Sequence, residues 1–177
     1  MSICNRVTSK MQIFDKSLIK HPKNYIWQSF LALITMLVLM SFVEFFTQTA
    51  IVAALGASTF IVFAMPWSIT AAPRRLIGGH VVGIICGLLC YYIFIGGPLE
   101  ELSKSHDIIV WFAYALSVSL SLFMMAVTNT EHPPAAATAL GIVAYGCSWQ
   151  TVVFVISFAV GLSIVKRLLK PCLKNLF

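Results

Sequence analysis

Residues 133–146 read PPAAATALGIVAYG, an uncharged stretch that opens with two prolines and is rich in alanine. Proline suits the first turn of a helix, where its fixed φ is already helical and its missing N–H would have no partner. We therefore predict a helix here. At 1.5 Å per residue, about 14 residues rise about 21 Å, which is less than the roughly 30 Å hydrocarbon core of a bilayer. Whether this short helix crosses a membrane decides the topology of the whole chain.

The composition of the 177-residue chain excludes an ordinary soluble domain. Hydrophobic residues make up 59% and charged residues 10%, against roughly 45–50% and 25% in soluble globular domains. The mean hydropathy is +0.91. A protein of this size has too little interior to hide so much apolar surface from water, so we predict an integral membrane protein.

Five further apolar runs have the length of a membrane-spanning helix, which is roughly 17–25 residues. They are residues 26–43, 48–65, 77–97, 108–127 and 150–169. The predicted fold class is therefore all-α, a polytopic transmembrane helix bundle.

The basic residues predict how this bundle is oriented, because Lys and Arg concentrate in cytoplasmic loops. If residues 133–146 cross, eleven of the twelve Lys and Arg residues face the cytoplasm and only Lys104 lies outside. If they do not cross, the basic C-terminus ends up outside. We therefore predict six crossings, the fifth of them short, with both termini cytoplasmic.

This topology divides the chain into three parts. Residues 1–24 form a basic N-terminal segment, in which Ser9 and Gln12 fit a capping box; an interfacial helix and a disordered tail are both open here. Residues 25–170 form the transmembrane domain, and residues 171–177 form a basic C-terminal tail. The net charge of +6 comes from residues beside the spans, as is typical of contact with the lipid bilayer, so we do not expect nucleic acid as a partner.

A polar cluster precedes the short helix. It comprises Thr128, Asn129, Thr130, Glu131 and His132, followed by Pro133 and Pro134. The positive end of a helix favours an anion, and the hydroxyl and amide groups can donate hydrogen bonds to it. His132 can supply a proton or a positive charge, whereas Glu131 would repel an anion unless it is protonated or paired. A cytoplasmic turn with a capped helix is the alternative interpretation.

A second cluster lies where the third apolar run begins, directly after Pro73. It comprises Arg74, Arg75, Gly78, Gly79 and His80. Guanidinium groups suit small oxyanions, and an ionisable group within a span is a functional candidate by default. The alternative is that the arginines only set topology and bind lipid phosphate, while His80 is a neutral packed histidine. Because both clusters lie on the same side of the predicted membrane, we expect them to converge on one anion site.

Small residues and cysteines complete the sequence pattern. Gly79, Gly83 and Gly87 recur every four residues, which predicts tight packing against another helix, with a homo-oligomer contact or a pore wall as alternatives. The five cysteines show no disulfide or zinc spacing. The sequence holds no nucleophile and base at a suitable spacing, so we expect no enzyme activity, catalytic residue, metal ligand or cofactor.

Together these motifs resemble the HPP family of integral membrane proteins, which is named for the His-Pro-Pro found here as His132, Pro133 and Pro134. The similarity covers roughly residues 25–170 and includes Gly56-Ala57-Ser58, Pro66, Pro73-Arg74 and Gly78-Gly79-His80. The chain departs from the family pattern at Ala72, Arg75 and Ala136, where members usually have Gln, Asn and Gly.

Plastid and cyanobacterial members of this family are implicated in nitrite transport. The resemblance therefore implies a transporter or channel for a small inorganic anion, with nitrite as the candidate, in the inner membrane of a bacterium. It leaves open whether the chain acts alone or as a homo-oligomer. A membrane scaffold or sensor that transports nothing is the alternative function.

Overall fold

The computed structural model describes residues 21–40 and 49–176, and within these ranges the chain is almost entirely helical and has no strand. The N-terminal segment, with its predicted capping box, lies outside the described residues for all but its last few positions. The elements, in chain order, are α2 (Pro22–Met40), α3 (Thr49–Ala64), η1 (Ile69–Ala71), α4 (Pro73–Cys90), η2 (Tyr91–Ile95), α5 (Glu100–Ser105), α6 (Asp107–Thr128), α7 (Pro134–Tyr145), α8 (Trp149–Leu168) and η3 (Lys170–Cys172).

Several of these helices have the length and composition of membrane spans. In the described part of the chain, Pro73–Ile95, Asp107–Thr128 and Trp149–Leu168 are long and apolar enough to cross, while α3 and α7 are apolar but shorter. The 12 residues of α7 rise about 18 Å. The predicted fold class, an all-α membrane helix bundle, is confirmed. The number of crossings and the side on which the termini lie stay predictions.

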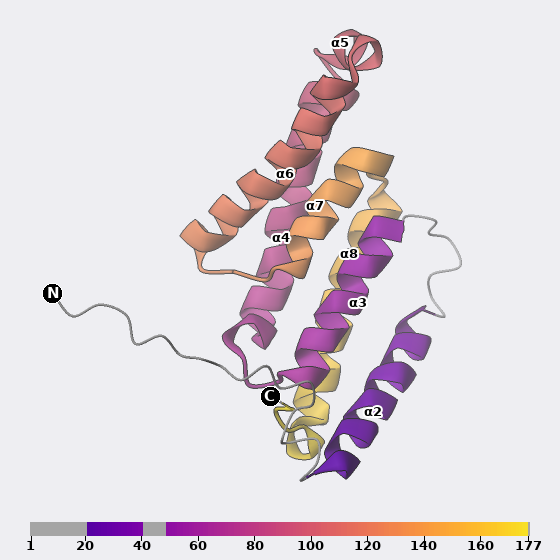
Figure 1. Cartoon of the computed structure of the whole chain (residues 1–177), viewed down its shortest axis with the longest axis vertical. Coiled ribbons are helices and arrows are strands. Elements are labelled where there is room, and N and C mark those ends of the chain that lie inside the picture. The colour runs from indigo at the N-terminus through magenta and orange to yellow at the C-terminus, as the bar shows by residue number, and fades with distance from the viewer. Residues whose placement is uncertain (1–20, 41–48, 177) are drawn as a thin grey trace, which may run out of the picture.

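Successive long helices run in alternating directions along the long axis of the molecule, with α2, α4 and α7 pointing one way and α3, α6 and α8 the other (Figure 1). The short helix α5 forms one tip of the molecule. The α6–α7 connection does not reach the opposite end of the bundle, and lies about halfway along it. This arrangement is expected of helices that cross a membrane one after another. Unlike its neighbours, α7 begins inside the bundle and not at its end.

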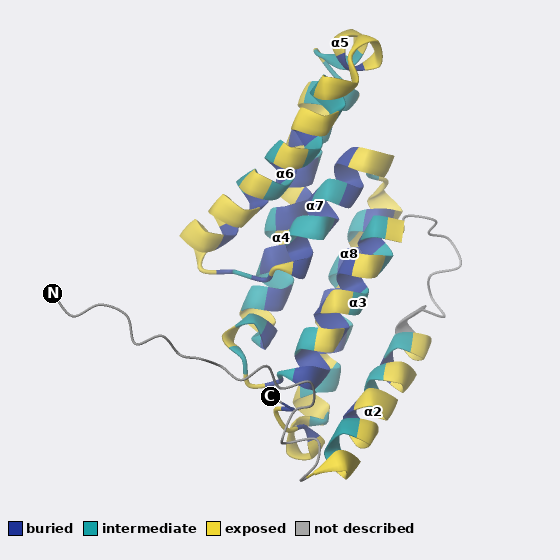
Figure 2. Cartoon of the chain, viewed as in Figure 1, coloured by how far each residue is buried: buried dark blue, intermediate teal, exposed yellow. Residues whose placement is uncertain are grey.

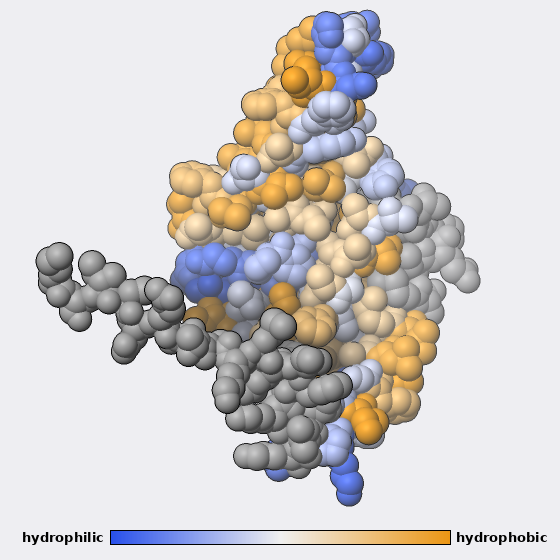
Figure 3. Space-filling view, in the orientation of Figure 1, coloured by the Kyte–Doolittle hydropathy of each residue, from blue (hydrophilic) through white to orange (hydrophobic). Residues whose placement is uncertain are grey.

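The core lies where α3, α4, α7 and α8 meet. Each of these helices contributes a fully buried side chain, namely Leu55, Leu76, Ile142 and Leu162. Figure 2 shows α4 and α7 largely buried, whereas α2 and α6 are exposed along much of their length. The exposed surface over α2 and α6 is hydrophobic, and the tip at α5 is hydrophilic (Figure 3). Large apolar side chains that face outward are what a lipid surrounding requires.

Small residues set the distance between α4 and α7, as the glycine spacing predicted. A Cβ atom added to Gly83 would lie 2.4 Å from the carbonyl oxygen of Ala135, and one added to Gly87 would lie 2.8 Å from that of Ala139. The two helices therefore run parallel with their backbones in contact. In lipid there is no hydrophobic drive between helices, and such close approach allows the van der Waals packing that helps to hold them together.

The described C-terminal residues fold back onto the bundle. Leu173 and Leu176 are buried, and the amide of Leu176 donates a hydrogen bond to the carbonyl of Ala64 at 3.0 Å. The side-chain amide of Gln28 in α2 donates to the carbonyl oxygens of Phe63 and Lys174. These contacts tie α2 and the C-terminus to the end of α3.

Candidate functional site

The α6–α7 loop folds inward against the first turns of α4. α6 ends where Asn129 takes the left-handed conformation, with φ of 55°, which asparagine tolerates better than most residues. Gly78 and Gly79 leave room for the loop, since a Cβ atom on Gly79 would lie 2.7 Å from Cβ of His132 and one on Gly78 would lie 2.7 Å from Cγ2 of Thr130. The two polar clusters found in the sequence therefore lie side by side.

A chain of hydrogen-bonded polar groups, which we call the histidine network, lies inside this region. Ser58 Oγ is 3.1 Å from His80 Nε2 and 2.9 Å from His132 Nε2. His80 Nδ1 is 3.0 Å from the hydroxyl of Thr138, and His132 Nδ1 is 2.9 Å from the carbonyl oxygen of Thr70. The side chains of Ser58, His80, His132 and Thr138 have no exposed surface. The network thus joins α3, α4, α7, η1 and the α6–α7 loop.

Sequence reasoning selected the two histidines but assigned them to an anion site and missed their partners. Ser58 and Thr138 each stand among small apolar residues on a helix face, and this isolation was the signal that could have identified them. No group of three or more His, Cys, Asp or Glu side chains that could hold a metal ion occurs among the residues that the structure describes. The two rings share a serine hydroxyl, an arrangement suited to holding and passing protons.

On the solvent-exposed side of the α6–α7 loop, Arg75 forms an ion pair with Glu131 and also donates a hydrogen bond to the side chain of Asn129. The pair neutralises the carboxylate that would otherwise repel an anion. Arg74 is exposed and joins none of the ion pairs in the described ranges. Arg75, rather than Arg74, is therefore the arginine that contacts the His-Pro-Pro loop.

The start of α7 differs from the sequence prediction, which expected backbone amides there to be free for an anion. Pro133 and Pro134 have no N–H group, and the amides of Ala135 and Ala136 donate to the carbonyls of His132 and Pro133 at 2.9 and 3.1 Å. These i to i+3 hydrogen bonds use the donors that an anion would need. The helix dipole remains, but direct amide contacts at this position do not.

The two threonines of the loop also bond within the protein. The hydroxyl groups of Thr128 and Thr130 lie 2.7 Å apart, and Thr128 also reaches the carbonyl of Met124 at 2.7 Å. Of the predicted site residues, the loop and the start of α4 are thus packed together, with most of their polar groups engaged by one another.

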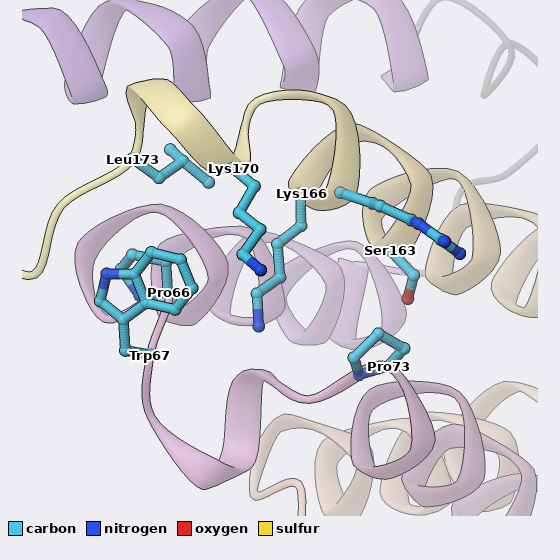
Figure 4. Close-up of a pocket in the computed structure, with 8 residues that line it drawn as sticks. Pro66, Trp67, Pro73, Ser163, Lys166, Lys170 and Leu173 are labelled. Atoms are coloured by element: carbon cyan, nitrogen blue, oxygen red, sulfur yellow. The ribbon is translucent and has the colours of Figure 1, made fainter.

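A cavity of about 350 Å³, the basic cavity, lies at the end of the bundle where α8 meets η1 (Figure 4). Its lining residues are Pro66, Trp67, Pro73, Ser163, Lys166, Arg167, Lys170 and Leu173. The ammonium groups of Lys166 and Lys170 point into the space between Trp67 and Pro73 (Figure 4). Lys170 Nζ lies 5.8 Å from the centre of the Trp67 ring. The sequence pointed to these cations only as orientation signals.

The lining of the basic cavity contains three cationic residues and no acidic one. None of the ion pairs between described residues involves Lys166, Arg167 or Lys170. A concave surface of one charge sign with apolar walls concentrates counter-ions. The basic cavity next to η1 is therefore a second cationic region, separate from the start of α7 where the sequence predicted an anion.

The turn η1 connects this cavity with the histidine network. The carbonyl oxygen of Thr70 accepts a hydrogen bond from His132, and that of the next residue, Ala71, accepts one from Lys166 Nζ at 2.7 Å. Two consecutive peptide groups thus face the network and the cavity. A change in the charge of His132 or in the contacts of Lys166 acts on the same short turn.

Comparison with known proteins assigns the chain to a membrane family. The family model described as "HPP, transmembrane region" matches residues 18–173. Two curated proteins of Dictyostelium discoideum, each named as a transmembrane protein, are 37% and 33% identical to the chain over 90 residues, which is 51% of this chain. The match covers only 28% and 26% of those proteins. No solved structure matches the chain.

Proposed function

Since the chain belongs to the HPP family of transmembrane proteins, we propose that it is a transporter or channel for a small inorganic anion, with nitrite as the candidate. The observation that carries this proposal is the basic cavity, whose three cationic residues have no acidic residue among them. Membrane orientation accounts for basic residues at this end of the last span, and their placement around one cavity that no acidic residue lines is what supports an anion site.

The size and charge of the cavity fit a small, partly hydrated oxyanion. A water molecule occupies about 30 Å³ of liquid volume, so about 350 Å³ leaves room for nitrite with several waters. A charge pair at about 4 Å is worth about 4 kcal/mol at an effective dielectric constant of about 20. Two ammonium groups that face the same space therefore favour an anion over neutral solutes.

Transport through the bundle requires η1 to move, because the histidine network and the packed core of α3, α4 and α7 lie beyond it. Lys166 holds η1 through the carbonyl of Ala71. An anion in the cavity attracts the ammonium group of Lys166 and draws it away from this carbonyl. We propose that this attraction loosens η1 when the anion is bound.

The proposed location is the inner membrane of a bacterium, in line with the sequence prediction. The comparisons support the membrane and not the organism, since the two relatives come from Dictyostelium discoideum. We propose the anion and the lipid bilayer as the partners of the chain, and a second copy as an optional one.

The test is anion uptake by the purified protein in liposomes, with nitrite, nitrate and chloride compared against protein-free vesicles. We expect Lys166→Gln and Lys170→Gln to reduce nitrite uptake. Lys104→Gln is the control, because Lys104 is a lysine outside the basic cavity. It lies on α5, where its hydrogen bond with Glu100 at 2.7 Å raises its pKa. No flux above protein-free vesicles with any anion would refute the proposal and favour the scaffold or sensor alternative. If the parent loses nitrite uptake only in vesicles that contain anionic lipid, the cavity binds lipid phosphate.

A further inference from the structure

The hydrogen bonds of the histidine network fix where its protons lie. The carbonyl oxygen of Thr70 can only accept a hydrogen bond, so His132 Nδ1, 2.9 Å away, carries a proton. In a neutral imidazole the other nitrogen, Nε2, is then an acceptor. The hydroxyl of Ser58, 2.9 Å from it, is the donor.

This assignment determines the rest of the network. Ser58 has one hydroxyl proton, and His132 receives it, so the 3.1 Å contact with His80 requires His80 Nε2–H to donate to Ser58 Oγ. His80 Nδ1 then accepts from the hydroxyl of Thr138 at 3.0 Å. In the neutral state, all hydrogen bonds therefore point one way, from Thr138 through both histidines to Thr70, and the two rings hold opposite tautomers.

A second partner of Ser58 provides for one additional proton. Ser58 Oγ also lies 2.9 Å from the carbonyl oxygen of Ala54. If His132 takes up a proton on Nε2, both of its nitrogens become donors, and Ser58 accepts from His132 and His80 while its own O–H turns to Ala54. Every polar group of the network is satisfied again. Release of the proton from Nε2 reverses the rotation of the hydroxyl.

His80 has no such provision. A proton added to its Nδ1 would face the hydroxyl of Thr138 and force that hydroxyl to give up its donated hydrogen bond. Among the described residues, the hydroxyl of Thr138 has no second partner within hydrogen-bond distance. The network therefore accommodates the added proton on His132.

The surroundings leave a protonated His132 without a counter-charge from the protein. Among the elements packed around the network, α3 carries no other titratable or charged group. The others carry Tyr145 on α7, Arg74, Arg75, Cys86 and Cys90 on α4, Asp107 and Tyr114 on α6, Glu131 on the loop, and Lys166 and Arg167 on α8. Glu131 is already paired with Arg75. A buried cation without a partner is costly, so an anion bound next to η1 would favour protonation of His132, and protonation would favour the anion to the same degree.

We propose that Ser58, His80 and His132 form a buried binding site for one proton, held on His132, and that this proton moves together with the anion. The second half of the proposal rests on the proposed transport function. The cationic ring and the anion would lie on opposite sides of η1, which both sites contact through consecutive carbonyl groups. The co-substrate of the anion is thus a proton.

Two measurements on the full-length protein test the proposal. The first is ¹⁵N NMR of the histidine rings in detergent; of the four histidines, His21 and His106 are exposed and serve as internal references. We expect opposite tautomers for His80 and His132 at neutral pH and uptake of a single proton by the pair. In Ser58→Ala, His80 should change from one tautomer to a mixture. Equal tautomers, or separate titration of both rings in the parent, would overturn the proton site.

The second measurement is nitrite uptake into liposomes that contain a pH-sensitive dye. We expect an imposed pH gradient to drive nitrite uptake by the parent and Ser58→Ala to lose this dependence. Ser117→Ala is the matched control, because Ser117 is equally buried but bonds only the carbonyl of Tyr114 in its own helix, at 2.8 Å. Parent-like coupling in Ser58→Ala would show that the coupled proton does not use the histidine network, and parent uptake that ignores the pH gradient would refute proton coupling.

The failure modes are separable. If the parent moves no anion, the proposed function is wrong, and the NMR pattern alone decides whether the proton site exists. If Ser58→Ala does not fold, Thr138→Val takes its place: it removes the donor to His80 Nδ1, but Ser58 still accepts from His80 Nε2–H, so His80 should keep its tautomer. A changed tautomer of His80 in a folded Thr138→Val protein would contradict the assigned direction of the network.

Discussion

Replacing Gly83 with alanine tests the contact that holds α7 against α4. The added Cβ atom would lie 2.4 Å from the carbonyl oxygen of Ala135, whereas ordinary Cβ contacts are 3.4–4 Å. The obstructing atom belongs to the backbone, so no side-chain rotation relieves the clash. The two helices must separate by about 1 Å at this point, and a gap of that size forfeits about a quarter to a half of the contact energy of the atoms that line it.

Gly56→Ala is the matched control, since a Cβ atom there meets nothing within 4 Å. Both substitutions gain about 1 kcal/mol of helix propensity, so this gain cancels in the comparison. Overpacking costs about 1–3 kcal/mol. For a chain of this size, that difference corresponds to a melting temperature about 2–12 °C lower for Gly83→Ala than for Gly56→Ala.

The assay is thermal unfolding of both purified variants in one detergent, followed by tryptophan fluorescence. Gly83→Leu should lose more stability than Gly83→Ala, because the larger side chain forces the helices further apart. If Gly83→Ala melts at or above the temperature of Gly56→Ala, the α4–α7 contact is wrong. The position of the His-Pro-Pro loop, which depends on this contact, would then be wrong as well.

Two further predictions concern the C-terminus and the topology. Gln28→Leu removes two donated hydrogen bonds and should destabilise the protein by about 1–3 kcal/mol, and we expect faster digestion of the C-terminal residues by carboxypeptidase; digestion at the parent's rate would show that Gln28 does not hold them. Single cysteines at Ser2 and Asn175, in a chain whose native cysteines are replaced, should react with an impermeant label only after the membrane is opened. Labelling of either position in intact cells would contradict the predicted cytoplasmic termini.

The amino-acid sequence determined the properties that depend on local composition. Apolar runs of sufficient length predicted an all-α membrane bundle, and each run corresponds to a helix in the described part of the chain. The paired prolines predicted the start of α7, because a helix tolerates proline in its first turn and not in its interior. The glycines at every fourth position predicted a close helix contact, since the spacing alone places them on one face.

The tertiary structure decided which polar groups meet. Ser58 lies 22 residues from His80 and 74 from His132, and Thr70 lies 62 from His132, so no local pattern links them. The sequence also favoured free amides at the start of α7, whereas the amides of Ala135 and Ala136 are occupied. It did not predict that Arg75 pairs with Glu131, and the role of both arginines in an anion site stays a prediction.

The basic cavity likewise depends on tertiary structure, because Lys166 in the last turn of α8 and Lys170 just after it indicate only orientation in the sequence. The physical reason is the same in each case. Hydropathy fixes where a helix forms, but its rotation and its position along the bundle are set by side-chain packing, here by the backbone contact of α4 with α7. That contact sets how deep the His-Pro-Pro loop lies, and therefore brings His132 to Ser58 and η1.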